Sequence, residues 1–215
     1  ASAESSATAQ PWTFSKVADY GTSIPGGSGT FANVGFSAPG VQNGRVAFSG
    51  QNMQGVFAGV YQWNSGVLSV VADTNTPIPA GTGNFISSSS FYPPSLDGGR
   101  TAFIGNGAGK VFIQQGVYVR DDGGVITRVV DRATPIPGLT TPFFSLGGPA
   151  SDGGQVAFPG FALNPAIGGI YRWQSGSISV VADHTMPIPG GTGLFNNFGE
   201  TDINNGVVAV AGRGA

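Results

Sequence analysis

Four aspartates recur at one place in a repeated sequence, and carboxylates can bind metal ions or transfer protons. Asp19, Asp73, Asp131 and Asp183 each follow a short apolar run and precede a Pro-rich stretch. Calcium favours carboxylate and carbonyl oxygens that turns bring together. The structural alternative is an Asp that accepts hydrogen bonds from the turn after it, and repeat symmetry would keep the four carboxylates apart. We favour turn anchors and predict no metal site.

The other ionisable side chains make a weak case for catalysis. His184 is the single histidine, and no base is identifiable for any serine. Asp121 and Asp122 lie in a Gly-rich hairpin turn, where solvation is the simpler interpretation. Glu200 and Asp202 fall on one face of a strand, and their spacing suits acid–base chemistry only inside a cleft. We therefore predict no catalytic residues, and a single histidine also disfavours haem or zinc as a cofactor.

Composition bounds the fold and the partners. The chain has 215 residues, of which 37 are Gly and 15 are Pro; 40% are hydrophobic, and only 9% are charged. Such a composition disfavours long amphipathic helices but leaves enough apolar surface for a β-sheet core. A net charge of -2 without a basic run argues against nucleic acid as a partner. No apolar stretch approaches the roughly 18 residues that span a bilayer, so we expect no membrane insertion.

Two features indicate the compartment. The chain contains no cysteine, which removes disulfides, thiolate nucleophiles and Cys-based zinc sites. Residues 1–9 are small and polar, like the mature end left by signal-peptide cleavage. Together with the low Lys and Glu content, this start predicts a secreted, extracellular or cell-surface protein.

The four aspartates lie at the same place in a repeated sequence unit. The interval from one repeat Asp to the next is 54, 58 and 52 residues. Each Asp is followed by an Ile-Pro pair and then by a phenylalanine: Ile24-Pro25 and Phe31, Ile78-Pro79 and Phe85, Ile136-Pro137 and Phe143, Ile188-Pro189 and Phe195. Asn-Gly or Asp-Gly-Gly turns, a Val-Ala-Phe type segment and a Gly-Val-Tyr type segment complete the unit, which is typical of hairpins.

Four short strands per unit, without helices between units, predict an all-β, four-bladed β-propeller-like repeat domain. We treat residues 1–215 as a single β-repeat domain. Its expected parts are a tail at 1–11, an N-terminal strand and crossover at 12–33, blade 1 at 34–88, blade 2 at 89–142, blade 3 at 143–196 and a partial blade 4 at 197–215.

The partial last blade predicts strand pairing with the N-terminal segment. Residues 197–212 supply two strands of a blade, whereas residues 12–19 occupy the place of a fourth strand. Pairing within one chain would close the ring, and pairing with a neighbouring subunit would build a head-to-tail assembly. The predicted assembly residues are Ser6, Ala7, Thr8, Trp12, Phe14 and Val17 on the donor side and Val207, Val208 and Val210 on the acceptor side.

The repeated phrase resembles a known type of sequence. Val-Val-Ala-Asp-x-x-Thr-Pro-Ile-Pro-Gly-Gly-Thr-Gly-x-Phe, with Ser-Leu-Asp-Gly-Gly and Ala-Phe-x-Gly, stands here at residues 70–85, 95–105, 155–160 and 180–195. It resembles repeats of secreted bacterial exoproteins, notably cyanobacterial ones that often carry a C-terminal Pro-Glu-Pro sorting anchor. The resemblance implies an extracellular β-repeat protein and no catalytic residues, and the anchor is absent from this sequence.

Three functional hypotheses follow from this sequence. The favoured one is a non-enzymatic extracellular structural protein that self-assembles by strand complementation into a surface fibre or matrix. The alternative is a monomeric lectin-like propeller that binds glycan or another extracellular partner, with Trp63 and Trp173 as candidate stacking residues. The third is an enzyme, for example a glycosidase.

Overall fold

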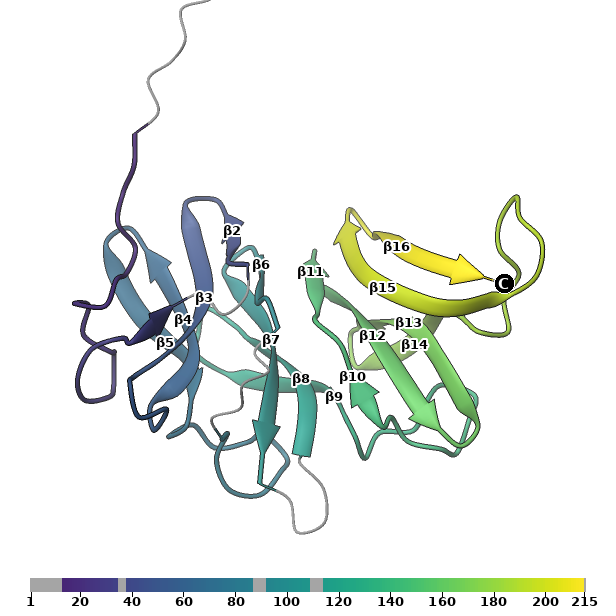
Figure 1. Cartoon of the computed structure of the whole chain (residues 1–215), viewed down its shortest axis with the longest axis horizontal. Helices are drawn as coiled ribbons and strands as arrows, with labels where there is room; N and C mark the ends of the chain where they lie inside the picture. The colour runs from purple at the N-terminus through teal and green to yellow at the C-terminus, as the bar shows by residue number, and fades with distance from the viewer. Residues whose placement is uncertain (1–12, 35–37, 87–91, 109–113, 215) are drawn as a thin grey trace, which may run out of the picture.

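The computed structural model describes residues 13–34, 38–86, 92–108 and 114–214, and these residues form β-strands, turns and loops without a helix. The strands make four antiparallel sheets, so the chain folds as an all-β, propeller-like domain of four blades (Figure 1). None of the described segments forms a helix that could span a membrane. We call the strand positions within a blade A to D, in chain order.

Three blades carry all four positions, and the fourth carries two. Blade 1 has β1 (Asn33–Val34) and β2 (Gly40–Gln42) at A, β3 (Arg45–Gln51) at B, β4 (Ala58–Asn64) at C and β5 (Val67–Asp73) at D. Blade 2 has β6 (Ser95–Asp97), β7 (Arg100–Gly107), β8 (Gln114–Arg120) and β9 (Ile126–Asp131). Blade 3 has β10 (Ser145–Leu146) and β11 (Ala150–Asp152) at A, then β12 (Gln155–Leu163), β13 (Ala166–Gln174) and β14 (Ser177–Asp183). Blade 4 has β15 (Phe195–Asn204) at A and β16 (Val207–Gly214) at B.

Two-residue turns with positive φ set the register of the hairpins. The A–B turn of blade 1 has φ 48° at Asn43 and 74° at Gly44, and that of blade 4 has φ 48° at Asn205 and 76° at Gly206. Left-handed residues at both positions give the turn whose twist matches antiparallel strands, and Asn-Gly is the pair that adopts it most readily. The Asn-Gly pairs in the sequence therefore set the strand register through the backbone conformation that they adopt.

An aromatic triad lies in the core of each complete blade. The Phe that ends the crossover meets the Tyr of strand C edge to face in all three blades: Phe31 and Tyr61 at 4.9 Å, Phe85 and Tyr118 at 5.0 Å, Phe143 and Tyr171 at 4.9 Å between ring centroids. A strand-B phenylalanine completes each set: Phe48, Phe103 and Phe158. Edge-to-face pairs of this kind add about 0.5–1.5 kcal/mol beyond the burial of their surface.

The apolar clusters join neighbouring blades. Val71 and Ala72 of β5 pack in one cluster with Phe85 and Tyr118 of the next repeat. Val129 and Val130 of β9 pack likewise with the blade 3 triad. Strand D of one blade therefore covers the core of the next, and a blade is complete only when the preceding strand D is in place.

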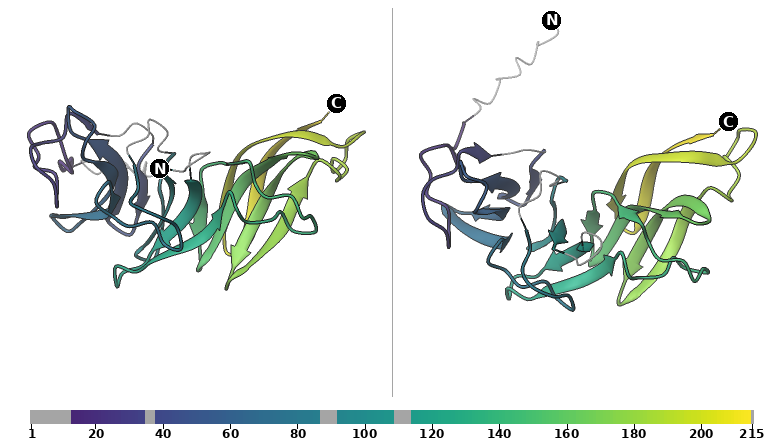
Figure 2. Two further views of the ribbon diagram at one scale, coloured as in Figure 1. Left: turned by 90° about the horizontal axis from the view of Figure 1, so that it is seen from below. Right: turned by 60° about the horizontal axis from the view of Figure 1, so that its bottom comes forward.

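The blades form a curved, open row. Among the strands at position A, β2 lies beside β6, β6 beside β11 and β11 beside β15. Both views in Figure 2 place the first blade and the C-terminal hairpin at opposite ends of this row. Within the described residues, the ring that pairing within one chain would form is not closed between β15 and β2.

The described part of the predicted N-terminal strand, residues 13–19, is not paired with any described strand of this chain. Residues 13–19 form no strand, and Val17 and Ala18 pack against the blade 1 cluster. This place corresponds to strand D of a preceding blade, and it holds the segment at the far end of the row from β16. Within one chain, the described residues 13–19 therefore do not pair with β16, because the two segments lie at opposite ends of the row (Figure 2).

Candidate functional site

The outer edge of β16 is the clearest difference between blade 4 and the other blades. The B strands of blades 1, 2 and 3 each pair with a C strand, whereas β16 pairs with β15 alone within the described residues. Val207 is 71% exposed, and Val208 and Val210 are half-buried. An edge strand presents unpaired N–H and C=O groups that can pair with another strand.

The apolar side chains beside this edge are under-covered. Phe195 and Ile188 are half-buried, whereas their equivalents in blade 3, Phe143 and Ile136, are 1% and 2% exposed. In place of a tyrosine, Phe195 contacts Phe198 at 5.1 Å between ring centroids. Among the described residues, the core of blade 4 thus has its A and B half but not the aromatic cover that a C strand supplies in the other blades.

The donor side lies only partly within the described residues. Ser6, Ala7, Thr8 and Trp12 fall outside them. Phe14 is 96% exposed, and Val17 packs on blade 1. Of the predicted donor residues, only Phe14 and Val17 are described, and neither of them lies beside β16.

The repeat aspartates anchor the crossover turns. One carboxylate oxygen of each accepts a backbone N–H two residues later, at 3.1 Å for Asp19, 3.0 Å for Asp73, 3.1 Å for Asp131 and 2.8 Å for Asp183. The same oxygen accepts a threonine hydroxyl at 2.6–2.8 Å in all four turns. A hydrogen bond from Lys16 is the main reason why the pKa of Asp19 is lowered. Among the described residues, no three His, Asp or Glu side chains are grouped so as to hold a metal ion.

A cavity of about 750 Å³ lies between two crossovers, residues 74–86 and 132–144. Apolar groups line much of it, with Ile78 and Tyr118 among them, and Asn164 adds an amide. Burial and the charge of Asp131 raise the pKa of Tyr118 to about 12, so its hydroxyl stays protonated at neutral pH. The volume falls in the range typical of small-ligand sites.

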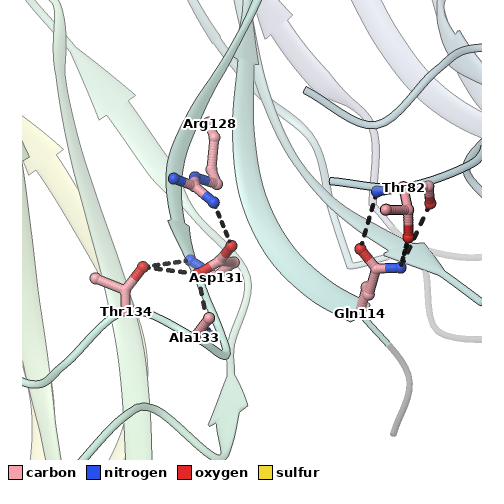
Figure 3. Close-up of polar contacts among 6 residues, drawn as sticks. All are labelled: Thr82, Gln114, Arg128, Asp131, Ala133 and Thr134. Atoms are coloured by element: carbon pink, nitrogen blue, oxygen red, sulfur yellow. Dashed lines mark hydrogen bonds and ion pairs between the residues drawn. The ribbon is translucent and has the colours of Figure 1, made fainter. Parts of the chain in front are cut away.

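Two polar groups frame this cavity (Figure 3). The Gln114 amide donates to the Thr82 hydroxyl at 3.0 Å and so ties β8 to the first of the two crossovers. On the other side, Asp131 pairs with Arg128 at 2.6 Å. Phe144 is 40% exposed at the rim, and the guanidinium of Arg132 lies 4.7 Å from the centre of its ring.

Sequence reasoning missed this cavity, although one signal was visible. The phenylalanine at the end of the third crossover is followed by a second aromatic residue, Phe144, whereas Ala32, Ile86 and Asn196 stand at the equivalent positions. At this position, the extra ring distinguishes the third crossover from the other three. Phe144 lies at a cavity because two crossovers lie a certain distance apart, and the sequence of a single repeat does not reveal that distance.

The two candidate tryptophans occupy equivalent positions in separate blades. Trp63 lies on β4 and Trp173 on β13, and both are half-buried. Trp173 packs against the large core cluster and lines a crevice of about 130 Å³ together with Asp97 and Arg100 of blade 2. Trp173 therefore lies between two blades, away from the crossover cavity.

The remaining carboxylate pair is on the surface. Glu200 and Asp202 on β15 are both exposed, and Asp202 accepts the N–H of Ile203 at 2.8 Å. Neither of them lines the crossover cavity. The geometry gives these two groups no cleft in which to act on a substrate together.

A repeat domain of antiparallel four-stranded blades, joined by Pro-rich crossovers, is the class that this fold defines. The chain belongs to the Family of unknown function (DUF7453), whose model matches residues 6–213. No curated protein sequence matches the chain.

One solved structure is similar over part of its length. It is Zg3597, a family 117 glycoside hydrolase produced by the marine bacterium Zobellia galactanivorans, with 12% sequence identity and a TM-score of 0.36. The similarity covers 72% of this chain and 46% of the hydrolase chain. The matched region is therefore less than half the length of the hydrolase.

Proposed function

We propose that the protein is a non-enzymatic extracellular structural protein that assembles by strand complementation into a surface fibre or matrix. The observation that carries the proposal lies in blade 4: among the described residues β16 pairs with β15 alone, and Phe195 lies half-buried beside its other edge. A second copy supplies the missing strands C and D from its residues 1–19. Backbone ladder hydrogen bonds give such an interface its direction and strength.

The two ends of the chain fit this arrangement. Residues 17 and 18 already pack on blade 1 as a strand D packs on the blade after it. When residues 1–19 also pair into blade 4 of another copy, that blade gains its strands C and D, every blade then has four strand positions, and the row continues from copy to copy. A head-to-tail interface that does not close on itself generates a fibre. The low charge of the chain, 9% of residues, limits repulsion between like subunits.

Blocking the edge tests this function. In the A–B hairpin, Val207 pairs toward β15, so the N–H groups of Val208 and Val210 point to the open edge. Val210→Pro removes one of these donors and should abolish oligomers, whereas Val210→Thr keeps the donor and should assemble. Deletion of residues 1–11 should have the same effect as Val210→Pro. Light scattering and electron microscopy give the mass and the shape of the particles.

Two outcomes would overturn strand complementation. One is assembly of the Val210→Pro or deletion variant to the same size as the wild type. The other is a uniform wild-type particle of 21.7 kDa at all concentrations. In either case, circular dichroism establishes that the variant keeps its β-structure.

The crossover cavity supports a second function, that of a lectin-like domain. Phe144 offers a partly exposed ring beside amide and hydroxyl groups, the combination that sugar binding uses. Binding on a glycan array that is lost in Phe144→Ala, and retained in Phe14→Ala, would establish this site. Loss in Trp63→Ala or Trp173→Ala would instead place the ligand at the tryptophans, and glycan hydrolysis would show an enzyme.

A further inference from the structure

The A–B turns of successive blades are linked by a repeated hydrogen bond. The side chain just before each turn accepts a backbone N–H from the turn of the following blade. The three bonds are Gly98 N to Gln42 Oε1 at 2.5 Å, Gly154 N to Asp97 Oδ2 at 2.7 Å and Asn205 N to Asp152 Oδ2 at 2.6 Å. We call this series the turn ladder, and it runs along one face of the curved row.

The turn ladder has an acceptor at one end and a donor at the other. Asn204 occupies the position of Asp97 and Asp152 and is exposed on the last turn. At the other end, Asn43 opens the first turn and is also exposed. Asn43 and Asn205 share φ 48°, so the first turn presents its N–H as the last turn does. The chain therefore carries both halves of a fourth rung.

We infer that Asn204 of one copy accepts the backbone N–H of Asn43 of a second copy and so continues the turn ladder across the subunit junction. This inference rests on the proposed function, because strand complementation brings blade 4 of one copy beside blade 1 of the next. It adds a second contact surface, the A–B turns, to the edge of β16. It also fixes the orientation of the copies, because each rung requires the following turn to lie where a neighbouring blade of the same chain would place it.

A second copy is the partner because its first turn presents the backbone N–H that the turns of this chain present to one another. Of the residues just before the four turns, Asp97 and Asp152 are carboxylates with bonds of 2.6–2.7 Å, whereas Gln42 and the acceptor at the open end, Asn204, are neutral amides. A carboxylate exposed without its donor would be fully hydrated in the free subunit, and stripping that water raises the cost of joining. An amide forms a weaker bond but loses less hydration, which suits a contact that forms between copies.

Cysteine cross-linking tests the rung directly because the chain has no cysteine of its own. The test variant carries Asn43→Cys and Asn204→Cys, and the control carries Asp152→Cys and Asn205→Cys, a rung within one chain. The control also places a cysteine at a turn residue with φ 48°, so it matches the backbone strain of the test variant. After oxidation, the control should give an intramolecular disulfide, and the test variant should give a ladder of covalent oligomers on a non-reducing gel.

Each outcome decides the inference. An intramolecular disulfide in the test variant would show that the ring closes within one chain and would overturn it. If the test variant forms fibres without cross-links while the control variant forms its disulfide, the rung between copies is contradicted and strand complementation is not. Absence of both fibres and cross-links would overturn the rung and the proposed function together.

A substitution that needs no cysteine gives a second measurement. Asn204→Ala removes the acceptor and should raise the concentration needed for assembly about fivefold, the effect of one hydrogen bond. Asn75→Ala, an exposed asparagine on a crossover, should leave that concentration unchanged. Equal values for the two variants would contradict the rung even where both variants form fibres.

Discussion

Blade 3 and blade 4 begin with the same repeated sequence, but equivalent side chains are buried to different degrees in the two blades. Both have an Ile-Pro crossover, a phenylalanine and a glycine in strand B that makes room for its ring. Phe143 is 1% exposed, whereas Phe195 is half-buried. The difference is the strand C tyrosine, which blade 3 supplies as Tyr171 and which no described residue supplies in blade 4. The repeat therefore specifies the position of each side chain, and the neighbouring strands determine how much stability that position contributes.

The largest expected effect comes from truncating the two phenylalanines. Phe143→Ala should lower the free energy of unfolding by about 3–5 kcal/mol, because it opens a cavity under Tyr171 and Phe158. Phe195→Ala should cost about 1 kcal/mol in the free subunit, since its ring is already half-solvated. Urea unfolding of both variants measures the difference, and equal losses would contradict the comparison.

The strand B glycines give a matched pair of insertions. A Cβ on Gly160 would lie 2.5 Å from the Phe143 ring, and one on Gly212 would lie 2.5 Å from the Phe195 ring. Gly160→Ala should cost about 1–3 kcal/mol, because the packed ring has no room to move. Gly212→Ala should cost less, since the partly exposed Phe195 can turn aside. Thermal unfolding of the two variants tests this order, which a larger loss in Gly212→Ala would reverse.

Alkaline pH should destabilise the complete blades through their tyrosines. Burial, with a smaller contribution from Asp183, raises the pKa of Tyr171 to about 12. The unfolded chain has an ordinary tyrosine pKa near 10, so stability is fully present below about pH 10 and declines as pH rises toward 12. Each such tyrosine contributes a slope of about 1.4 kcal/mol per pH unit in that window.

Tyr171→Phe is the variant that isolates this effect. The Tyr171 hydroxyl has no hydrogen-bond partner among the described residues, so the substitution should change stability at pH 7 very little. It should reduce the slope measured by urea unfolding between pH 10 and 12. A slope identical to that of the wild type would contradict the assignment of this pH dependence to the ionisation of Tyr171.

The smallest expected effect is a stabilising one in the fourth crossover. In the first three turns, the threonine three residues after the Asp accepts the Asp N–H at 2.9, 3.0 and 3.2 Å. Met186 holds that position in the fourth turn. Met186→Thr should restore this bond and add about 0.5–1 kcal/mol. Met53→Thr, at a side chain that is 82% exposed, is the control, and equal changes in thermal midpoint would argue against a turn effect.

The sequence predicted the all-β, four-sheet fold well because its signals are local. Asn43-Gly44 and Asn205-Gly206 fix turns through backbone conformation alone, and the repeat then aligns the strands between them. Other features depend on contacts between repeats. Residues 13–19 carry the repeat phrase yet form no strand, since the described residues offer them no adjacent strand. The cavity beside Phe144 likewise depends on how far apart two crossovers lie, and no single repeat contains that distance.

Because strand D of each repeat covers the core of the next, the unit of sequence and the unit of packing are out of phase by about one strand. A duplication that copies the chain from one Asp to the next inserts a strand D together with the three strands that precede it. Both new junctions then fall inside cores that already have matching halves on either side. A gene for such a protein can lengthen or shorten by whole repeats without exposing a new apolar face, as in other proteins whose repeats contact only their neighbours.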